Sequence, residues 1–372
     1  MQKRYFSASN SNLKDKIKLI DYPLFFLILL LGIISFFSMY SSEGGAFNYY
    51  TQNHIYRFCI FFILFILLSF LNIQFWHKSS YLFYFIVLLL LISVHIFGVT
   101  ASGSKRWINI LFFNIQPSEL MKTFLLVVLA RYYSTIPSQD VSNIKKMIIP
   151  LFAIFIPVFF IIKQPDLGTA MLVAFGGFAL IWLAGFRLKY LVITSILSIC
   201  LLPVAVSFLK TYQKSRILTF LNPERDPLGA GYQIIQSKIA VGSGGIFGKG
   251  YLLGSQSYLD YLPEKHTDFI FTLFSEEFGF FGSLSLLVIY ALIIQRIISI
   301  GNKGKSHFVK LYCYGFAMSF FIYVGVNMSM VLGLLPIVGA PLPIMSYGGS
   351  SMLSIMIGLS IVMSSKIYSQ NT

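Results

Sequence analysis

The sequence of 372 residues has few charges: Asp, Glu, Lys and Arg make up 11% of it, and only 13 residues are acidic. Soluble domains are about 25% charged, and so few charges could not cover the surface of a water-soluble globule of this length. The composition therefore excludes an ordinary soluble enzyme, a disordered chain and a coiled coil. Hydrophobic residues make up 56% of the chain and include 38 Phe, which indicates a polytopic membrane protein.

Cysteine and histidine are also scarce. The three cysteines, Cys59, Cys200 and Cys313, each fall within an apolar run, so no disulfide framework is predicted. The five histidines show no metal-ligand spacing, and the absence of a Walker A motif and a dinucleotide-binding fingerprint gives no support to ATP-driven transport. The net charge of +15 is attributed to basic loop residues that orient the helices and contact anionic lipid headgroups. No nucleic acid partner is expected.

Ten apolar runs are long enough to span a bilayer, which needs about 20 residues. They lie at 22–41, 55–73, 80–99, 117–136, 147–163, 168–186, 189–209, 268–294, 309–332 and 345–365. The fold class expected is an all-α polytopic membrane protein with ten transmembrane helices. Residues 1–21 and 367–372 form cytoplasmic tails, and 22–366 form a single membrane domain. Because a basic N-terminal segment leads directly into a full-length span, the first helix is expected to be the insertion signal.

The distribution of basic residues predicts that both termini are cytoplasmic. Sixteen Lys and Arg residues lie in the inner short segments and four in the outer ones, which follows the positive-inside rule. The inner residues are Lys3, Arg4, Lys14, Lys16, Lys18, Lys78, Arg131, Lys145, Lys146, Arg187, Lys189, Arg296, Lys303, Lys305, Lys310 and Lys366; the outer ones are Arg57, Lys105, Arg106 and Lys163.

One connection is much longer than the others. Residues 210–267, between the seventh and eighth spans, are extracytoplasmic on this topology, and loops of this length are often functional. Within them, 228–241 has apolar residues near helical spacing and is expected to form a helix on the membrane surface. The chemistry is therefore expected on the outer face.

Ionisable residues within or beside the spans are costly, by about 2.5–3.5 kcal/mol each on insertion scales, and so are the best functional candidates. Glu119 and Lys122 are three residues apart and share a helix face. They form either a self-neutralising pair or a charged cluster facing a water-filled cavity. Asp268 begins the eighth span, near the helix N-terminus and at the outer edge of the hydrocarbon. It either caps that helix, as Thr267 could, or acts as a base on a lipid-borne substrate.

Other polar motifs have two interpretations each. Glu276 and Glu277 point about 100° apart on a helix, so we expect one to pair with Lys or Arg in a structural or gating role. The turn 164–169, with Asp166, is either an ordinary turn or part of a site. Arg106 and Trp107 form an interface anchor or a phosphate contact. The glycine-rich stretch 243–250, with Lys249, is an anion-binding nest or a flexible loop. The uncharged segment 336–351 is interpreted as a re-entrant segment that opens or bends the tenth span.

Long motifs in the chain resemble the shape, elongation, division and sporulation (SEDS) family over about residues 20–366. The motifs are GSKRWI at 103–108, QPSE at 116–119, QPDLGT at 164–169, FLNPERDPLGAGYQ at 220–233, QSKIAVGSGGIFGKG at 236–250, LPEKHTDFIF at 262–271, EEFGFFG at 276–282 and PLPIMSYGGSS at 341–351. The QSKIA run and the context of the HTDF motif look more like the elongation members of the family than the division members.

The resemblance implies a peptidoglycan glycosyltransferase that polymerises lipid II at the outer face of the cytoplasmic membrane during elongation and rod-shape maintenance. It assigns the catalytic role to Asp268. It places Arg106 and Trp107, and the cavity-lining pair Glu119 and Lys122, among the substrate-binding residues. The matching basic positions Lys249, Lys265 and His266 are expected to contact substrate as well.

Reasoning from the residues agrees with this assignment. A sugar hydroxyl is a poor nucleophile and needs a base, and a leaving lipid diphosphate needs nearby cations. The family linkage implies an inverting displacement with one base and no covalent sugar–enzyme intermediate. A divalent cation, Mg²⁺ or Mn²⁺, stays open as a cofactor, although no dedicated metal site is visible in the sequence. The partner implied is a class B penicillin-binding protein of the elongation machinery, in contact with the outer residues of spans eight and nine.

Two other functions stay open at this stage. A lipid II flippase could use the intramembrane charges Glu119, Lys122, Glu276 and Glu277 as a path, although the chain lacks obvious inverted repeats. A scaffold that only recruits a polymerase would leave the cost of Asp268 and of these charges unexplained.

Overall fold

The structure is a computed structural model, and it describes residues 13–101, 104–110, 113–187, 211–226, 229–255 and 264–369. Helices account for nine of the ten predicted spans. They are α2 (Tyr22–Ser42), α3 (Tyr49–Ser69), α4 (Ile73–Phe97), α5 (Pro117–Ser134), α6 (Ile144–Lys163), α7 (Leu167–Leu183), α13 (Ile270–Lys303), α14 (His307–Val331) and α15 (Gly349–Ser369). The predicted span 189–209 lies outside the described residues.

Seven of these described helices are long and apolar enough to cross a membrane; ten spans are not confirmed. The other two fall short for different reasons. Helix α7 has 17 residues. Helix α5 has 18 residues but carries Glu119, Lys122 and Arg131. Most side chains of α5 are nevertheless buried, and the ion pair of Glu119 and Lys122 lies in the protein interior.

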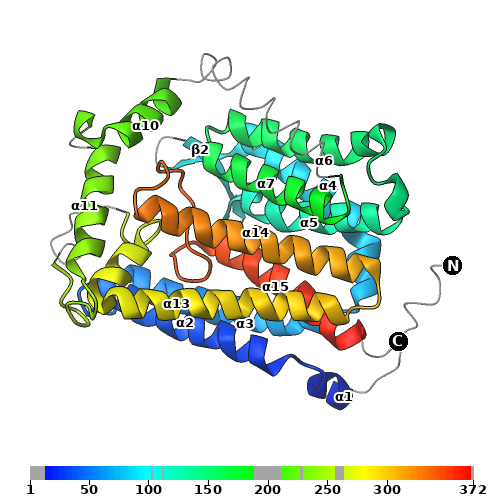
Figure 1. Cartoon of the computed structure of the whole chain (residues 1–372), viewed down its shortest axis with the longest axis horizontal. Helices are drawn as coiled ribbons and strands as arrows, with labels where there is room; N and C mark the ends of the chain where they lie inside the picture. Colours follow the sequence, from blue (N-terminus) through cyan, green and yellow to red (C-terminus); the bar gives the residue numbers. More distant parts are fainter. Residues whose placement is uncertain are drawn as a thin grey trace.

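The long helices form a bundle in which α13 packs on α14 and α2, and α15 packs on α3 and α5 (Figure 1). Helix α15 is the most enclosed of the seven candidate spans, with 83% of its apolar window buried. Together, α5 and α15 bring polar side chains into the middle of the bundle.

Both described ends of the chain lie at one end of the bundle (Figure 1). The short helix α1 (Leu13–Lys18) places the Lys16 ammonium 5.2 Å from the Tyr368 ring centre near the end of α15. Helices α10 (Thr211–Leu221) and α11 (Ala230–Ser243), with the short 3₁₀ helix η3 (Pro223–Arg225) between them, lie at the opposite end. A helix was predicted over 228–241, and α11 confirms it.

The expectation of an entirely helical chain was wrong in one segment. Residues 99–115, expected to be a basic loop, contain strands β1 (Val99–Ala101), β2 (Ser104–Ile110) and β3 (Phe113–Ile115) in an antiparallel sheet. Trp107 pairs with Val99, and Asn109 pairs with Asn114. The apolar β-branched residues of this segment suit a strand, but the basic residues beside them masked that signal.

Helix α13 is interrupted at Gly279, whose φ of 64° and ψ of −158° are essentially restricted to glycine. The break frees backbone groups that the glycine-rich loop 244–250 then satisfies. The amides of Lys249 and Gly250 donate to the carbonyls of Glu276 and Glu277, and the amides of Phe280 and Phe281 donate to Gly245 and Ile246. The loop is therefore a fixed part of α13 packing and not the flexible loop or anion nest considered from the sequence.

Candidate active site

Asp268 lies in the turn 264–269, immediately before α13. Neither Thr267 nor Asp268 caps the helix: the N-cap is Phe269, without a side-chain hydrogen bond, and the Thr267 hydroxyl donates to Glu264 Oε2 at 2.7 Å. The Asp268 side chain is half-buried. Within the described residues, nothing donates a hydrogen bond to its carboxylate, so the helix-cap interpretation is wrong and the carboxylate is available to a substrate.

The surroundings of Asp268 favour its protonated form. Burial, followed by the negative charges of Glu264 and Asp166, raises the pKa of Asp268 to about 7, and the Arg216 guanidinium acts in the opposite direction. A carboxyl group with a pKa near neutrality is well suited to accept a proton from a hydroxyl at physiological pH.

The uncharged segment between α14 and α15 faces Asp268. The side-chain amide of Asn327, on α14, donates to the backbone carbonyls of Asp268 (2.9 Å) and Ala340 (2.6 Å). A Cβ atom at Gly339 would lie 3.7 Å from Asp268 Oδ2, and no other described residue beyond its chain neighbours comes within 4 Å of it. On this side, no described residue fills the space in front of the carboxylate.

Arg106, predicted to bind substrate, lies against the turn 164–169. Its Nε donates to the Gln164 carbonyl at 3.2 Å, and Nη1 lies 3.9 Å from Asp166 Oδ2. Asp166 is buried and caps α7 by accepting from the amide and hydroxyl of Thr169. Gln116 Nε2 donates to the same carboxylate at 3.0 Å. Three motifs that are separate in the sequence thus meet at Asp166.

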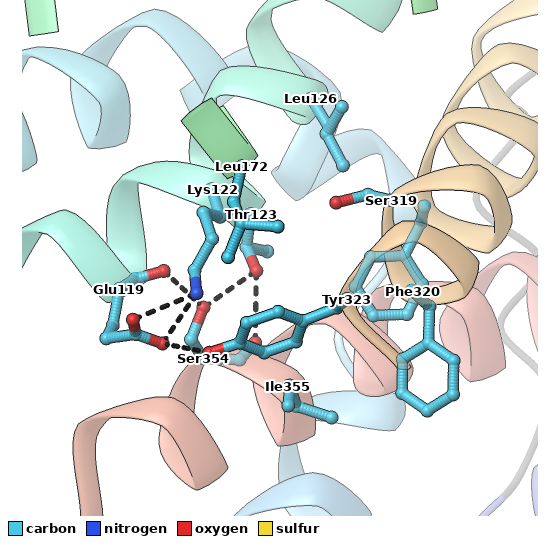
Figure 2. Close-up of a pocket in the computed structure, with 11 residues that line it drawn as sticks. Glu119, Lys122, Thr123, Leu126, Leu172, Ser319, Phe320, Tyr323, Ser354 and Ile355 are labelled. Atoms are coloured by element: carbon cyan, nitrogen blue, oxygen red, sulfur yellow. Dashed lines mark hydrogen bonds and ion pairs between the residues drawn. The ribbon is translucent and has the colours of Figure 1, made fainter. Parts of the chain in front are cut away.

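Glu119 and Lys122 form a buried ion pair in the middle of the bundle, with 2.8 Å between Lys122 Nζ and Glu119 Oε2. Figure 2 shows both side chains pointing toward Tyr323 of α14. The Tyr323 hydroxyl donates to Glu119 Oε2 at 3.0 Å, and Lys122 Nζ lies 3.8 Å from the centre of the Tyr323 ring. The adjoining cavity is small, about 30 Å³. It holds about one water molecule, so the pair is neutralised in place.

His266, two residues before Asp268, packs into an aromatic cluster. Its ring stacks on Tyr50 with 4.1 Å between the ring centres, and its Nδ1 lies 2.8 Å from the Ser42 hydroxyl. The Tyr347 amide donates to the His266 carbonyl at 2.8 Å. The Arg57 guanidinium lies 4.5 Å from the centre of the Tyr347 ring. Lys265 is half-buried beside His266.

Lys249 is not near Asp268 by any contact in the described part of the chain; it pairs with Glu276. The Lys249 Nζ lies 2.7 Å from Glu276 Oε1, which also accepts from the Ser255 hydroxyl at 3.1 Å. The expected pairing of one of the two glutamates with a basic residue is confirmed. Glu277 points elsewhere and accepts from Ser41 and from the Leu252 amide.

An apolar cavity of about 410 Å³ lies between α11, α13 and α14. Its lining includes Phe271, three residues after Asp268, together with Phe280, Leu284 and Met328. Such a lining suits a hydrocarbon chain better than a saccharide.

The described residues offer no set of three side chains that could bind a metal ion. Over the described ranges, no three His, Cys, Asp or Glu side chains come together in a way that could hold an ion. The divalent cation left open by the sequence therefore has no cluster of three protein ligands in this part of the chain.

Sequence reasoning missed three residues of this region. Arg216 donates from α10 to the Ile337 carbonyl at 3.1 Å and acts on the Asp268 charge. Tyr323 completes the Glu119 cluster, and Asn327 supports the Asp268 turn. The only available signal was weak for each: a basic residue in a long outer segment, and lone polar side chains within an apolar run.

Comparisons with known proteins agree on one family. The family model FtsW/RodA/SpoVE, described as cell cycle protein, matches residues 19–371. Peptidoglycan glycosyltransferase MrdB of Escherichia coli K12 is 43% identical over 284 residues, which is 76% of each chain. The probable peptidoglycan glycosyltransferase FtsW of Buchnera aphidicola is 34% identical over 94% of each chain.

Solved structures match in fold as well. A chain from a structure described as structural coordination of polymerization and crosslinking by a peptidoglycan synthase complex has a TM-score of 0.81 and 32% identity, over 93% of this chain and 97% of that one. The rod shape determining protein RodA of Thermus thermophilus has a TM-score of 0.68 and 26% identity, over 93% and 96% of the two chains.

Proposed function

The chain belongs to the FtsW/RodA/SpoVE family, which is the SEDS family that its motifs resemble, and we propose that it is a peptidoglycan glycosyltransferase acting in cell elongation. The proposed reaction joins lipid II disaccharide units into glycan strands at the outer face of the cytoplasmic membrane. The higher identity to MrdB than to the FtsW relatives supports the elongation role over a division role.

The observation that carries the proposal is the state of the Asp268 carboxylate. It is half-buried, accepts no hydrogen bond from the described residues, faces the open space at Gly339 and has a pKa raised to about 7. A structural carboxylate would be paired or used as a cap, as Asp166 is. An unpaired carboxylate with a near-neutral pKa is instead suited to proton transfer.

In the proposed step, Asp268 removes the proton from the attacking sugar hydroxyl. The oxygen attacks the anomeric carbon of the donor, the bond to the diphosphate breaks with its electron pair, and the configuration inverts. The proton ends on Asp268, and the diphosphate leaves as an anion that cations must stabilise. The proposed cations are Arg216, whose charge acts on Asp268, and Arg106, at the turn 164–169.

The remaining predicted residues are proposed to act around this centre. Trp107 is half-buried on β2 next to Arg106, and Lys265 and His266 precede Asp268 directly; we assign all three to substrate binding. Glu119 and Lys122 are assigned to the interior of the same site, because the Glu119 charge is one of those that raise the pKa of Asp268.

The partner proposed is a class B penicillin-binding protein, which would cross-link the new strand. The support is the solved peptidoglycan synthase complex that this chain resembles over 93% of its length. The outer parts of α13 and α14 are the proposed contact.

A polymerisation assay tests the function. Purified chain, with and without its transpeptidase partner, is given lipid II, and the glycan products of wild type and Asp268→Asn are compared. We expect strands from the wild type and none from a normally inserted Asp268→Asn. Polymerisation by that variant at the wild-type rate would remove Asp268 from the mechanism.

The same preparation tests the flippase alternative, which the intramembrane ion pair of Glu119 and Lys122 keeps open. The chain is placed alone in liposomes with lipid II in both leaflets. Translocation without glycan synthesis would replace the polymerase proposal with a transporter.

A further inference from the structure

Asn327 lies on α14 with no exposed surface, inside the apolar part of the bundle. Both N–H groups of its side-chain amide are used: one points to the Asp268 carbonyl and the other to the Ala340 carbonyl. Its Oδ1 atom is buried and accepts no hydrogen bond from the described residues. The structural contribution of Asn327 is therefore the two hydrogen bonds that it donates. Its unsatisfied Oδ1 acceptor costs free energy in the protein interior.

The two carbonyls belong to the two sides of the open space described above. Asp268 is on one side, and Ala340 follows Gly339, which has a φ of 71° and faces Asp268 Oδ2. The Asp268 carbonyl precedes the helix N-cap, and the donor that it receives is the Asn327 amide of α14. One amide thus sets the separation between the carboxylate and the opposite wall.

We propose that Asn327 is a positioning residue that holds the Asp268 turn and the Gly339–Ala340 segment at the separation needed for the acceptor hydroxyl to reach the base. The inference rests on the proposed glycosyl transfer with Asp268 as base. Positioning of this kind acts on the transition state, because a shift of about 1 Å in a reacting group can lower a rate roughly 100-fold.

The same contact fixes the Asp268 turn among its charged neighbours. The charged groups that face Asp268 are Glu264 on its own turn, Asp166 and Glu119, which disfavour ionisation, and Arg216, which favours it. Loss of the Asn327 donors would leave the Asp268 carbonyl without its hydrogen bond, so the turn would move away from these groups and toward water to recover one. The acid limb of the rate profile would then move to lower pH, toward the ordinary range of an aspartate.

Tyr290 offers a matched control. It is buried on α13, and its hydroxyl donates to the Pro343 carbonyl at 2.7 Å, so it holds the same connecting segment without touching the Asp268 turn. Asn327→Leu and Tyr290→Phe each remove buried donors to this segment. A purely structural role for Asn327 would make the two variants alike.

The test measures glycan synthesis from lipid II by full-length wild type, Asn327→Leu and Tyr290→Phe between pH 5 and 9, with thermal unfolding in the same detergent. We expect Asn327→Leu to lower kcat roughly 10- to 100-fold and to keep KM within about threefold of the wild-type value. The acid limb of its rate profile is expected at lower pH than that of the wild type. Tyr290→Phe is expected to keep the wild-type limb and a kcat within about threefold of the wild type.

If Asn327→Leu does not fold, Asn327→Ser, which keeps one donor, is measured in its place with the same criteria. An acid limb at the wild-type position in a folded Asn327 variant overturns the proposal, as does an equal loss of kcat in Tyr290→Phe. Failure of the proposed function gives a different result: the wild type makes no glycan, or Asp268→Asn stays fully active.

Discussion

Gly248 and Gly279 are in backbone contact where α13 is interrupted. A Cβ atom at Gly248 would lie 2.0 Å from the Glu277 carbonyl oxygen, and one at Gly279 would lie 2.3 Å from the Gly248 amide nitrogen. Both residues have positive φ angles, 83° and 64°. The two glycines let the loop 244–250 replace the hydrogen bonds that the helix break removes.

Gly248→Ala is therefore expected to destabilise the protein strongly. Its left-handed φ alone costs an alanine about 1–2 kcal/mol, and the overlap with Glu277 adds to this. Gly242→Ala is the matched control, since a Cβ atom there has nothing within 4 Å and alanine favours helix α11. Thermal unfolding in detergent should show a large loss for the first variant and none for the second; equal effects would contradict the proposed contact.

A second prediction concerns the ion pair between Asp21 and Arg296, at the end of the bundle that holds α1. Arg296 Nη2 lies 2.7 Å from Asp21 Oδ2, and the Asp21 side chain is 3% exposed. Asp21→Asn keeps the hydrogen bond that caps α2 but removes the charge. We expect it to lower the free energy of unfolding by about 1–3 kcal/mol, less than for a fully buried pair because Arg296 is partly exposed.

Asp140→Asn is the control for that measurement. Asp140 pairs with Lys146, but both side chains are substantially exposed, and such pairs contribute about 1 kcal/mol or less. A loss from Asp21→Asn no greater than from Asp140→Asn would show that the pair at Asp21 is not a significant link between α2 and α13.

The helices and Asp268 could be predicted from the sequence because their signals are local. Apolar runs of about 20 residues identify spans directly, and Glu119 and Lys122 pair as their spacing of three predicts. The position of Asp268 at the start of a helix also follows from where an apolar run begins.

The partners of these residues could not be predicted, because they depend on contacts between distant segments. Asn327 reaches Asp268 across 59 residues, and Lys249 reaches Glu276 across 27. The glycine-rich loop has the composition of a flexible loop, and only the break at Gly279 makes it rigid. The strands at 99–115 were missed because a short apolar segment beside basic residues resembles an ordinary membrane loop.

A third prediction separates the structural and substrate-binding interpretations of Lys249. Lys249→Met would leave the Glu276 carboxylate, which has no exposed side-chain surface, without its cation; removing one partner of a buried pair costs about 3–5 kcal/mol. We expect lower thermal stability, and recovery of most of it in the double variant Lys249→Met, Glu276→Gln. A stable single variant with a KM for lipid II raised about tenfold or more would instead make Lys249 a substrate contact.

The last prediction concerns pH and the neighbour of the base. The pKa of Asp268 is raised to about 7 by burial first and by the Glu264 charge next. Only the ionised form of Asp268 can accept a proton, so glycan synthesis should increase as pH rises through about 7. Glu264→Gln removes the second cause and is expected to shift this limb to lower pH. Glu224→Gln, an exposed carboxylate on η3 that is not among the charges acting on Asp268, should leave the limb in place.

The stability of the protein should depend on pH for the same reason. Because folding raises the pKa of Asp268 from 3.8 to about 7, the free energy of unfolding should fall as pH rises between these two values and stay level above them. Asp268→Asn should therefore raise the melting temperature at pH 8 more than at pH 5, and an equal effect at both values would show that the carboxylate is not held in the environment described here.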